Sequence, residues 1–482
     1  MKVDPKFLRF RNPAMRPVIC WFRQDLRLAD NPALTASIAT GKPVTCVYIL
    51  DDESLGRWRL GGASRWWLHQ SLQSLADGLE EIGGRLLLRR GSAEVVIPAL
   101  ARETGSRAVY WNRCYEPAAI QRDQRLKAAL AQTGMVAESF NGLLLREPWE
   151  VKTISGTPFK VFTPFWRAGY GAWHPSAPLP PPSRMLAGGC DAVSDHLEDW
   201  GLLPKKPDWS GGLRAAWQPG EPSAQFRLAD FLGRLTQYAA SRDEPSTAGT
   251  SRLSPHLHFG EISARQIWHA VTSRPPSPDG DKFLSEIGWR EFSYHLLFHN
   301  PKMIAEPLDA KFANFPWSTD DAGLAAWTHG RTGFPIVDAG MRELWTTGWM
   351  HNRVRMIAAS FLVKQIGIDW RRGAEWFWDT LVDADLASNS ASWQWVAGCG
   401  TDAAPFFRIF NPVLQGEKFD PEGDYVRRWV PELAHLPSKF IHKPWLAPPE
   451  MRSTVTSYPE PILDLASARK RAIDAYKALS PP

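Results

Sequence analysis

Polar residues at helical spacing fill the segment 348–412, and their types fit the wall of a cavity better than a packed core. Two sets would each lie on one helix face: Asn352, Arg355 and Met356 in the first, and Asp385 and Asn389, preceded by Asp383, in the second. Buried amide, guanidinium and carboxylate groups are costly unless they pair with one another or bind a ligand. The segment therefore predicts a cavity for a polar cofactor.

A second segment carries an acid, an indole and a guanidinium on one face, because Glu286, Trp289 and Arg290 stand at positions i, i+3 and i+4. Taken alone, this pattern favours a surface ion pair beside a core tryptophan. Upstream of it, hydroxyl groups that could cradle a phosphate precede an expected helix: Thr250, Ser251 and Ser254. Turns of this kind usually only cap a helix, so each signal needs the other to indicate a site.

The composition limits the class of protein that these residues serve. The chain has 482 residues, 44% hydrophobic and 22% charged, which is enough for two or more globular domains. A net charge of +5 permits contact with a polyanion without requiring it. Five cysteines lie far apart, which favours reduced thiols in the cytoplasm over disulfides or a metal site. No apolar run reaches membrane-spanning length, so we expect no membrane partner.

The order of the expected elements places the polar segments in the second half of the chain. Short apolar strands at 17–22, 43–50, 85–90 and 107–112 alternate with helices that include 64–82 and 94–104. This alternation predicts a parallel, Rossmann-like α/β sheet, although no glycine-rich nucleotide motif follows the first strand. We expect four parts: an N-terminal arm at 1–16, an α/β domain at 17–146, an inter-domain connector at 147–223, and an all-α domain at 224–482. Within the connector, residues 170–221 are rich in Pro, Gly and Trp and are expected to run over the surface.

Six motifs occur in a fixed order along the chain: WFRQDLRLADNPAL, SRLSPHLHFGEIS, WREF, GFPIVDAGMRELWTTGWMHNRVRM, IDWRRGAEWFWDTLVDADLASNSASWQW and GTDAAPFFRIFNP. Together they resemble the photolyase/cryptochrome family, most of all its bacterial members that repair cyclobutane pyrimidine dimers, over essentially the whole chain. The resemblance implies that the all-α domain binds FAD in a folded form. The residues that match the flavin site are Tyr238, Thr250, Ser251, Arg252, Leu253, Ser254, Glu286, Trp289, Arg290, Asn352, Arg355, Asp383, Asp385 and Asn389.

The resemblance also implies a lesion site above the flavin, formed by two indoles beside a glutamate, an amide and a thioether. The matching residues, expected to be catalytic, are Glu286, Trp289, Asn352, Met356 and Trp395. The (6-4) repair branch has histidine where this chain has Asn352 and Met356. Plant cryptochromes have aspartate at the position of Asn389 and lack the indole of Trp395. The first difference speaks against (6-4) repair, and the second favours repair over signalling.

The implied activity is that of a deoxyribodipyrimidine photo-lyase, a carbon–carbon lyase that needs light. Photoexcited reduced FAD passes one electron to the dimer, the cyclobutane ring splits, and the electron returns. The alternative is a cryptochrome-type blue-light photoreceptor with the same flavin site and no repair. No metal is expected in either case.

The abundance of tryptophan, 24 residues, suggests that a few of them relay electrons rather than only fill the core. The resemblance implies a chain of three that carries electrons from the surface to oxidised flavin: Trp393, Trp370 and Trp317. Whether Trp376 or Trp378 forms a second branch stays open at this point. The positions that match or neighbour DNA-facing cations in the family are Arg242, Arg353, Arg408 and Lys418.

The family's α/β domain often binds a light-harvesting antenna. Glu116, in WNRCYEPAAI, matches an acid that can bind a pterin ring, so we expect 5,10-methenyltetrahydrofolate rather than a deazaflavin. The expected partner is UV-damaged DNA that contains pyrimidine dimers, single- or double-stranded. We expect a cytoplasmic monomer with no obligate protein partner.

Overall fold

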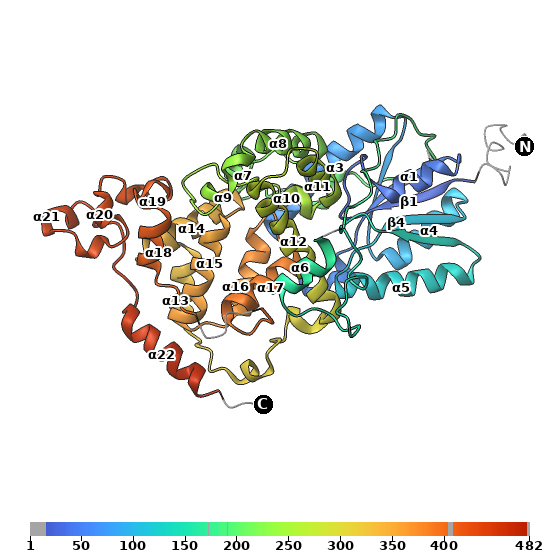
Figure 1. The fold of residues 1–482 in the computed structure, drawn as a ribbon. Helices are drawn as coiled ribbons and strands as arrows, with labels where there is room; N and C mark the ends of the chain where they lie inside the picture. Colours follow the sequence, from blue (N-terminus) through green and yellow to red (C-terminus); the bar gives the residue numbers. More distant parts are fainter. Residues whose placement is uncertain (1–15, 172, 190, 403–407, 480–482) are drawn as a thin grey trace, which may run out of the picture.

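The computed structural model describes residues 16–171, 173–189, 191–402 and 408–479. Most of the N-terminal arm expected at 1–16 therefore lies outside the described residues, as does Cys190. The chain forms an α/β part from its first third and a helical part from its second half, which lie side by side in Figure 1. None of the helices described is both long and apolar enough to cross a bilayer.

The α/β part is built on a parallel five-stranded sheet in the order β3-β2-β1-β4-β5. Its strands are β1 (Val18–Phe22), β2 (Val44–Leu50), β3 (Leu86–Arg90), β4 (Ala108–Asn112) and β5 (Val136–Phe140). The first two strands are buried along their whole length, because the crossover helices pack against the sheet. These helices include α1 (Pro32–Ala39), α3 (Gly62–Glu81), α4 (Ala93–Thr104) and α5 (Pro117–Gln132).

The predicted Rossmann-like sheet is confirmed, and each of the four predicted strands begins within one residue of its observed start. The edge strand β5 was not predicted. Its sequence, VAESF, is short, and each of its residues keeps some exposure to solvent. An edge strand of this kind lacks the continuous apolar run that marks the central strands.

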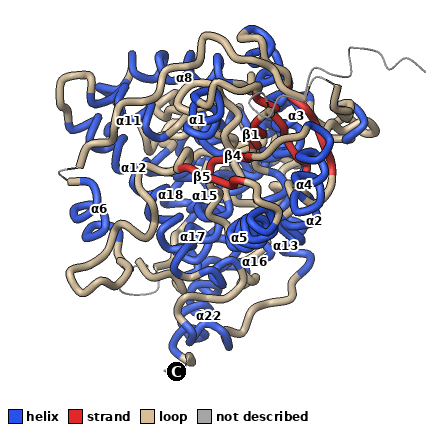
Figure 2. Tube along the Cα trace, turned by 90° about the vertical axis from the view of Figure 1, so that its right-hand side faces the viewer, coloured by secondary structure: helices blue, strands red, loops and turns tan. Residues whose placement is uncertain are grey.

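The helical part holds the second half of the chain. Its principal helices are α8 (Glu221–Gly233), α9 (Tyr238–Ser241), α10 (Ser254–His258), α11 (Ala264–Thr272), α12 (Pro278–His299), α13 (Asp321–Thr328), α14 (Pro335–Thr347), α15 (Asn352–Ser360), α16 (Trp370–Thr380), α17 (Leu386–Ala397), α18 (Pro412–Phe419), α19 (Asp424–Trp429) and α22 (Leu465–Lys477). Helix α15 runs into a π-helical turn at Phe361–Ile366. Figure 2, turned by 90°, shows these helices beside and behind the small sheet.

The connector expected at 147–223 includes a helix with buried residues before its Pro-, Gly- and Trp-rich stretch. It contains α6 (Phe162–Tyr170), whose Phe162, Phe165 and Tyr170 are buried in the same apolar core as α12. These three residues have helical spacing, so a short amphipathic helix was readable in the sequence. The surface prediction concerned residues 170–221, which begin where this helix ends, and α6 places Phe162 beside the candidate site.

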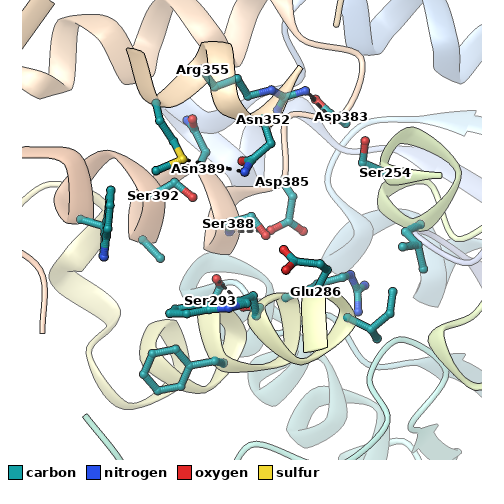
Figure 3. A pocket seen from close by; sticks show the side chains of 18 of the residues that line it. Ser254, Glu286, Ser293, Asn352, Arg355, Asp383, Asp385, Ser388, Asn389 and Ser392 are labelled. Atoms are coloured by element: carbon teal, nitrogen blue, oxygen red, sulfur yellow. Dashed lines mark hydrogen bonds and ion pairs between the residues drawn. The ribbon is translucent and has the colours of Figure 1, made fainter. Parts of the chain in front are cut away.

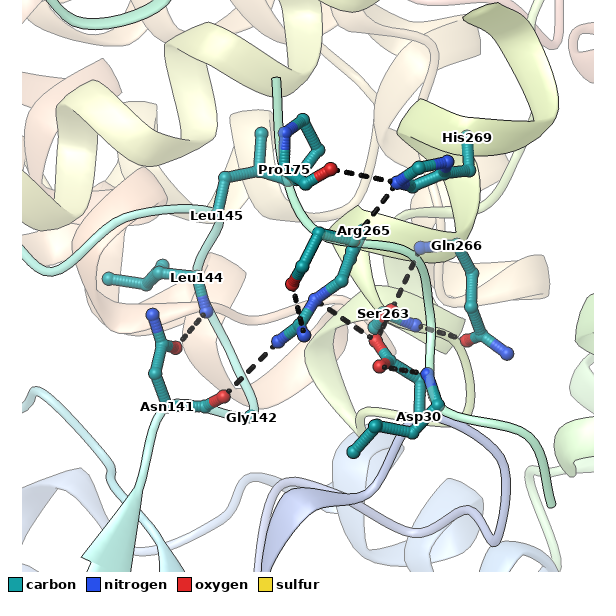
Figure 4. A network of polar contacts seen from close by, with 12 residues as sticks. Asp30, Asn141, Gly142, Leu144, Leu145, Pro175, Ser263, Arg265, Gln266 and His269 are labelled. Atoms are coloured by element: carbon teal, nitrogen blue, oxygen red, sulfur yellow. Dashed lines mark hydrogen bonds and ion pairs between the residues drawn. The ribbon is translucent and has the colours of Figure 1, made fainter. Parts of the chain in front are cut away.

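Specific contacts join the two parts. Gly62 N donates to Asp379 Oδ1 at 2.8 Å, and Trp67 Nε1 donates to Glu261 Oε1 at 2.9 Å. A second seam, drawn in Figure 4, links the α/β part to the start of α11: Ser263 Oγ donates to Asp30 Oδ2 at 2.6 Å. Gly260 lies at this boundary, and only glycine fits there. A Cβ would lie 2.0 Å from the carbonyl oxygen of Gln24, and the φ of Gly260 is +67°.

Candidate functional site

A cavity of about 610 Å³ opens in the helical part, within the range of cofactor sites. It lies between α12 on one side and α15 and α17 on the other, with Glu286 facing Asp385 and Asn352 across it in Figure 3. Every residue expected at the flavin lines this cavity: Tyr238, Thr250, Ser251, Arg252, Leu253, Ser254, Glu286, Trp289, Arg290, Asn352, Arg355, Asp383, Asp385 and Asn389. The residues that the family resemblance implied come from several elements and line one cavity.

An ion pair crosses one end of the cavity. Arg355 Nη2 donates to both carboxylate oxygens of Asp383, at 2.8 and 3.1 Å, and Arg355 Nε donates to the carbonyl oxygen of Met350 at 2.7 Å. The Asp383 side chain is 3% exposed and that of Arg355 is 24% exposed. A nearly buried carboxylate held by a guanidinium gives the cavity a fixed pair of opposite charges.

Asp385 does not lie on the face of a helix, as its spacing suggested, but caps one. It precedes α17, and its Oδ1 accepts a hydrogen bond from Ser388 N at 2.7 Å. Its other oxygen accepts from the hydroxyl of Tyr294. Asn389 still lies close, because its backbone N donates to the carbonyl oxygen of Asp385 at 2.8 Å. Its amide Nδ2 donates to the carbonyl oxygen of Ala374 at 3.1 Å, which fixes the orientation of the amide.

The residues expected to hold the lesion line the same cavity: Glu286, Trp289, Asn352, Met356 and Trp395. The indole of Trp289 stacks on Phe162 with 3.9 Å between ring centroids and an interplanar angle of 10°. Asn352 Nδ2 lies 3.9 Å from the sulfur of Met356. The flavin set and the lesion set therefore share one chamber, and Phe162 supports one of its aromatic walls.

Two of the four cationic residues expected to contact DNA form ion pairs within the protein. Arg242 donates through Nη1 to Glu286, and Arg353 Nη2 lies 2.7 Å from Asp243 Oδ2. Both arginines line the cavity. Arg408 and Lys418 do not line it, and each lies over a neighbouring phenylalanine ring: Phe410 at 4.9 Å and Phe419 at 5.1 Å.

The three expected relay tryptophans belong to one hydrophobic cluster. Trp393 lines the cavity and is 2% exposed, Trp370 is 1% exposed, and Trp317 packs on the cluster half-buried. The two other candidates take different neighbours. Trp376 stacks on Trp345, which is 57% exposed.

The second of these candidates, Trp378, lies against the α/β part. Its ring meets Trp58 edge-on at 5.3 Å, and its Nε1 donates to the carbonyl oxygen of Arg59 at 2.8 Å. It also lines the smaller cavity described next. Trp376 therefore faces the exposed side of the helical part, whereas Trp378 faces the boundary with the sheet.

A smaller cavity of about 120 Å³ lies between the two parts and is lined by Glu116. Glu116 is buried, and its Oε1 accepts a hydrogen bond from Gln24 Nε2 at 2.8 Å. Burial raises the pKa of the Glu116 carboxyl above its usual value. Its Oε2 has no hydrogen-bond partner among the described residues. His258 lines both this cavity and the large one.

Sequence reasoning missed three residues of the large cavity or its surroundings. Trp349 lines the cavity, donates to Ser254 Oγ at 3.3 Å and lies 4.8 Å from the guanidinium of Arg252. Lys282 stands four residues before Glu286, so helical spacing could have found it. Phe162 comes from a distant part of the chain, and no local pattern connects it with Trp289.

The donor set fits a large, partly anionic cofactor. Hydroxyl-bearing residues Thr250, Ser251 and Ser254 line the cavity. Four lining residues carry a buried polar atom with no hydrogen-bond partner among the described residues: Arg252 Nε, His258 Nδ1, Arg353 Nε and Thr401 Oγ1. Hydroxyl and guanidinium groups suit phosphate oxygens. The Arg355–Asp383 pair suits a polar ring system. Fold and site together define a cofactor-binding α/β-plus-helical protein with an aromatic-walled chamber.

Comparisons with known proteins agree with this class. A family model described as the FAD binding domain of DNA photolyase matches residues 283–478, and one described as DNA photolyase matches residues 18–183. The chain is 52% identical to a deoxyribodipyrimidine photo-lyase of Agrobacterium fabrum, over 96% of this chain and 98% of that protein. It is 40% identical to cryptochrome-1 of Arabidopsis thaliana, over 96% of this chain and 70% of that protein.

Solved structures give the same result. The crystal structure of a bacterial class III photolyase from Agrobacterium tumefaciens matches with a TM-score of 0.94 and 50% identity, over 98% of this chain and 99% of that chain. An archaeal photolyase from Sulfolobus tokodaii, whose structure contains two FAD molecules, matches with a TM-score of 0.80 and 30% identity, over 96% of this chain and 99% of that chain. The protein belongs to the photolyase/cryptochrome family.

Proposed function

We propose that this protein is a light-dependent DNA repair enzyme that splits cyclobutane pyrimidine dimers with an electron from reduced FAD. One observation carries the proposal: the residues suited to a flavin and those suited to a flat, extruded lesion line a single open cavity. The relative at 52% identity bears the name deoxyribodipyrimidine photo-lyase, which supports the same activity here.

FAD would be held by three groups of side chains. The hydroxyls of Thr250, Ser251 and Ser254, with Arg252, would bind its phosphates. The Arg355–Asp383 pair and the Asn389 amide would bind the flavin ring. When bound, reduced FAD supplies one light-driven electron to the dimer and takes it back after the two ring bonds have broken. The protein contributes charge, orientation and the exclusion of water.

The lesion would lie between the indoles of Trp289 and Trp395, which offer flat apolar walls to fused pyrimidines. Extruding a damaged, poorly stacked step costs only a few kcal/mol. Glu286 and Asn352 would bind the polar edges of the bases, while Met356 packs beside them. Phe162 keeps the Trp289 ring in its plane because it stacks on that ring at 3.9 Å.

Electrons for reducing oxidised flavin would pass along Trp317, Trp370 and Trp393. The shared cluster of these residues and the place of Trp393 on the cavity wall support this route. Damaged DNA would meet Arg242, Arg353, Arg408 and Lys418 through its phosphates, so binding should weaken as salt rises.

The small cavity would hold the antenna, for which we propose 5,10-methenyltetrahydrofolate. The free Oε2 of the buried Glu116 supports this choice, because a pterin ring presents N–H donors to a carboxylate. Release of the chromophores and their separation by chromatography tests it. A released deazaflavin or a second FAD would replace the folate in this proposal.

We further propose a division of labour along the chain: 17–146 carries the antenna, 147–223 connects, and 224–482 holds FAD and the lesion. The protein would act as a cytoplasmic monomer without an obligate protein partner. Analytical ultracentrifugation of the purified protein tests the monomer.

The deciding experiment illuminates the reduced protein with an oligonucleotide that contains one thymine dimer. Thymine absorbance should return with light and stay constant in the dark. The second candidate is a blue-light photoreceptor, favoured by the 40% identity to cryptochrome-1 over 96% of this chain. A photoreceptor would show flavin photochemistry under the same lamp without the return of thymine absorbance.

A further inference from the structure

Lys282, on α12, is a cation at the rim of the large cavity that the proposed repair reaction does not use. It lines the cavity, its side chain is 45% exposed, and its Nζ lies 3.1 Å from Oε1 of Glu286. The same oxygen accepts a hydrogen bond from Arg242 Nη1. Two cations therefore converge on one oxygen of the carboxylate that is proposed to bind the lesion bases.

These residues belong to a longer series of alternating charges, which we call the rim ladder: Lys282, Glu286, Arg242, Asp243 and Arg353. Arg242 Nε lies 3.8 Å from Asp243 Oδ1, and Arg353 Nη2 lies 2.7 Å from Asp243 Oδ2. The three cations differ in exposure: Arg242 is 12% exposed, Arg353 19% and Lys282 45%.

Exposure decides which cation can change its partner. The guanidinium of Arg242 is enclosed, with Asp243 on one side and the Tyr238 ring 5.4 Å away. Lys282 has a flexible stem and a point charge that accepts partners from many directions. It is therefore the member of the rim ladder that can leave Glu286 at the least cost.

We propose that Lys282 moves from Glu286 to a backbone phosphate of the extruded dipyrimidine when the lesion enters the cavity. The exchange keeps Lys282 paired with an anion, and it frees one position on Glu286 Oε1 for an N–H of the bases. Phosphate binding and base recognition are thereby coupled through one side chain. This inference rests on the proposed repair function.

The proposal predicts a contact that only damaged DNA makes. An undamaged duplex keeps its bases stacked. No nucleotide is extruded into the cavity, so the DNA backbone stays away from Lys282. An ordinary i, i+4 ion pair on an exposed helix face would instead influence the helix alone and leave both kinds of DNA unaffected.

The experiment measures dissociation constants of the flavin-loaded protein for an oligonucleotide with one thymine dimer and for the same oligonucleotide without it, over a series of salt concentrations. K282A should weaken dimer binding about three- to tenfold and reduce the salt slope by about 0.7 to 0.9, the value of one phosphate contact. Binding of undamaged DNA should not change. K282R, which retains the charge, should restore the slope.

The matched control is K302A. Lys302 forms an i, i+4 pair with Glu306 at 3.7 Å, is 80% exposed and does not line the cavity. It should change neither constant. An unchanged salt slope for K282A, or equal weakening for both DNAs, would overturn the proposal. Flavin absorbance and the melting temperature of each variant confirm that it is folded.

A double variant tests the exchange itself. In an E286Q background Lys282 has no carboxylate to leave, so K282A should cost more dimer affinity there than in the wild type. Equal costs in the two backgrounds would overturn the exchange. Absence of light-driven repair by the wild type would refute the proposed function instead, which separates the two failures.

Discussion

Removal of Arg355 should damage the site in a way that can be calculated from its burial. The Asp383 carboxylate is 3% exposed, so R355A leaves a nearly buried charge without its partner. Breaking a buried ion pair costs about 3–5 kcal/mol. Because Arg355 itself is 24% exposed, we expect the low end, about 3 kcal/mol.

A loss of that size is easily measured. It should lower the melting temperature by roughly 6–12 °C, at about 2–4 °C per kcal/mol for a domain of this size. The variant should also retain less flavin after gel filtration, since the pair lines the cavity. D383N alone should cost less than R355A, because the asparagine it leaves is neutral.

Two further variants test whether the burial of the Asp383 carboxylate causes the loss. R355A/D383N should recover about 1–3 kcal/mol relative to the sum of the single changes, because no charge is left buried. The control R372A breaks a pair of the same length, 2.8 Å to Asp321, whose side chains are 40% and 81% exposed. It should cost less than about 1 kcal/mol. Equal losses in R355A and R372A, or strict additivity, would show that burial is not the cause.

Three other predictions follow from single contacts. W393F should suppress photoreduction of oxidised flavin while leaving dimer repair by chemically reduced protein, and unchanged photoreduction would exclude the relay through Trp393. Burial lowers the pKa of His351 from 6.5 to about 4, and its Nδ1 accepts from Arg353 N at 3.2 Å. As the pH falls from 6.5 to 4, the unfolded chain takes up this proton before the folded one, so stability falls. Chemical denaturation should show a weaker fall for H351N, and parallel curves would contradict this account. E116A should lose the antenna chromophore while keeping FAD, as measured by absorbance of the purified protein; a retained antenna would remove Glu116 from its site.

Much of the site was predictable because helical spacing is local. Asn352, Arg355 and Met356 emerge on one face of α15, and Glu286, Trp289 and Arg290 on one face of α12. Spacing failed at Asp385, because a residue four positions before another can also be the cap of the helix. It was silent about Phe162, whose contact with Trp289 spans more than a hundred residues. Contacts between residues so far apart in the sequence depend on the tertiary fold, and the hydrophobic periodicity of a single segment does not predict them.

The fold, like the site, was predictable only where the sequence pattern is local. Strands β1, β2, β3 and β4 were readable because burial forces apolar runs on them, whereas the partly exposed edge strand β5 carries no such mark. The pairing of Arg242 with Glu286 was likewise not readable, because the two residues lie on separate elements. An arginine expected only to face DNA thus also pairs with a glutamate of the proposed lesion site.

The wall shared by the two cavities has a mechanical consequence. His258 borders both cavities, so a bulkier residue at this position would take volume from both at once. At this shared wall, one cavity cannot gain volume unless the other loses it. The two cavities, and the ligands proposed for them, therefore constrain each other through one side chain, although most of the residues that line each cavity come from a different part of the chain.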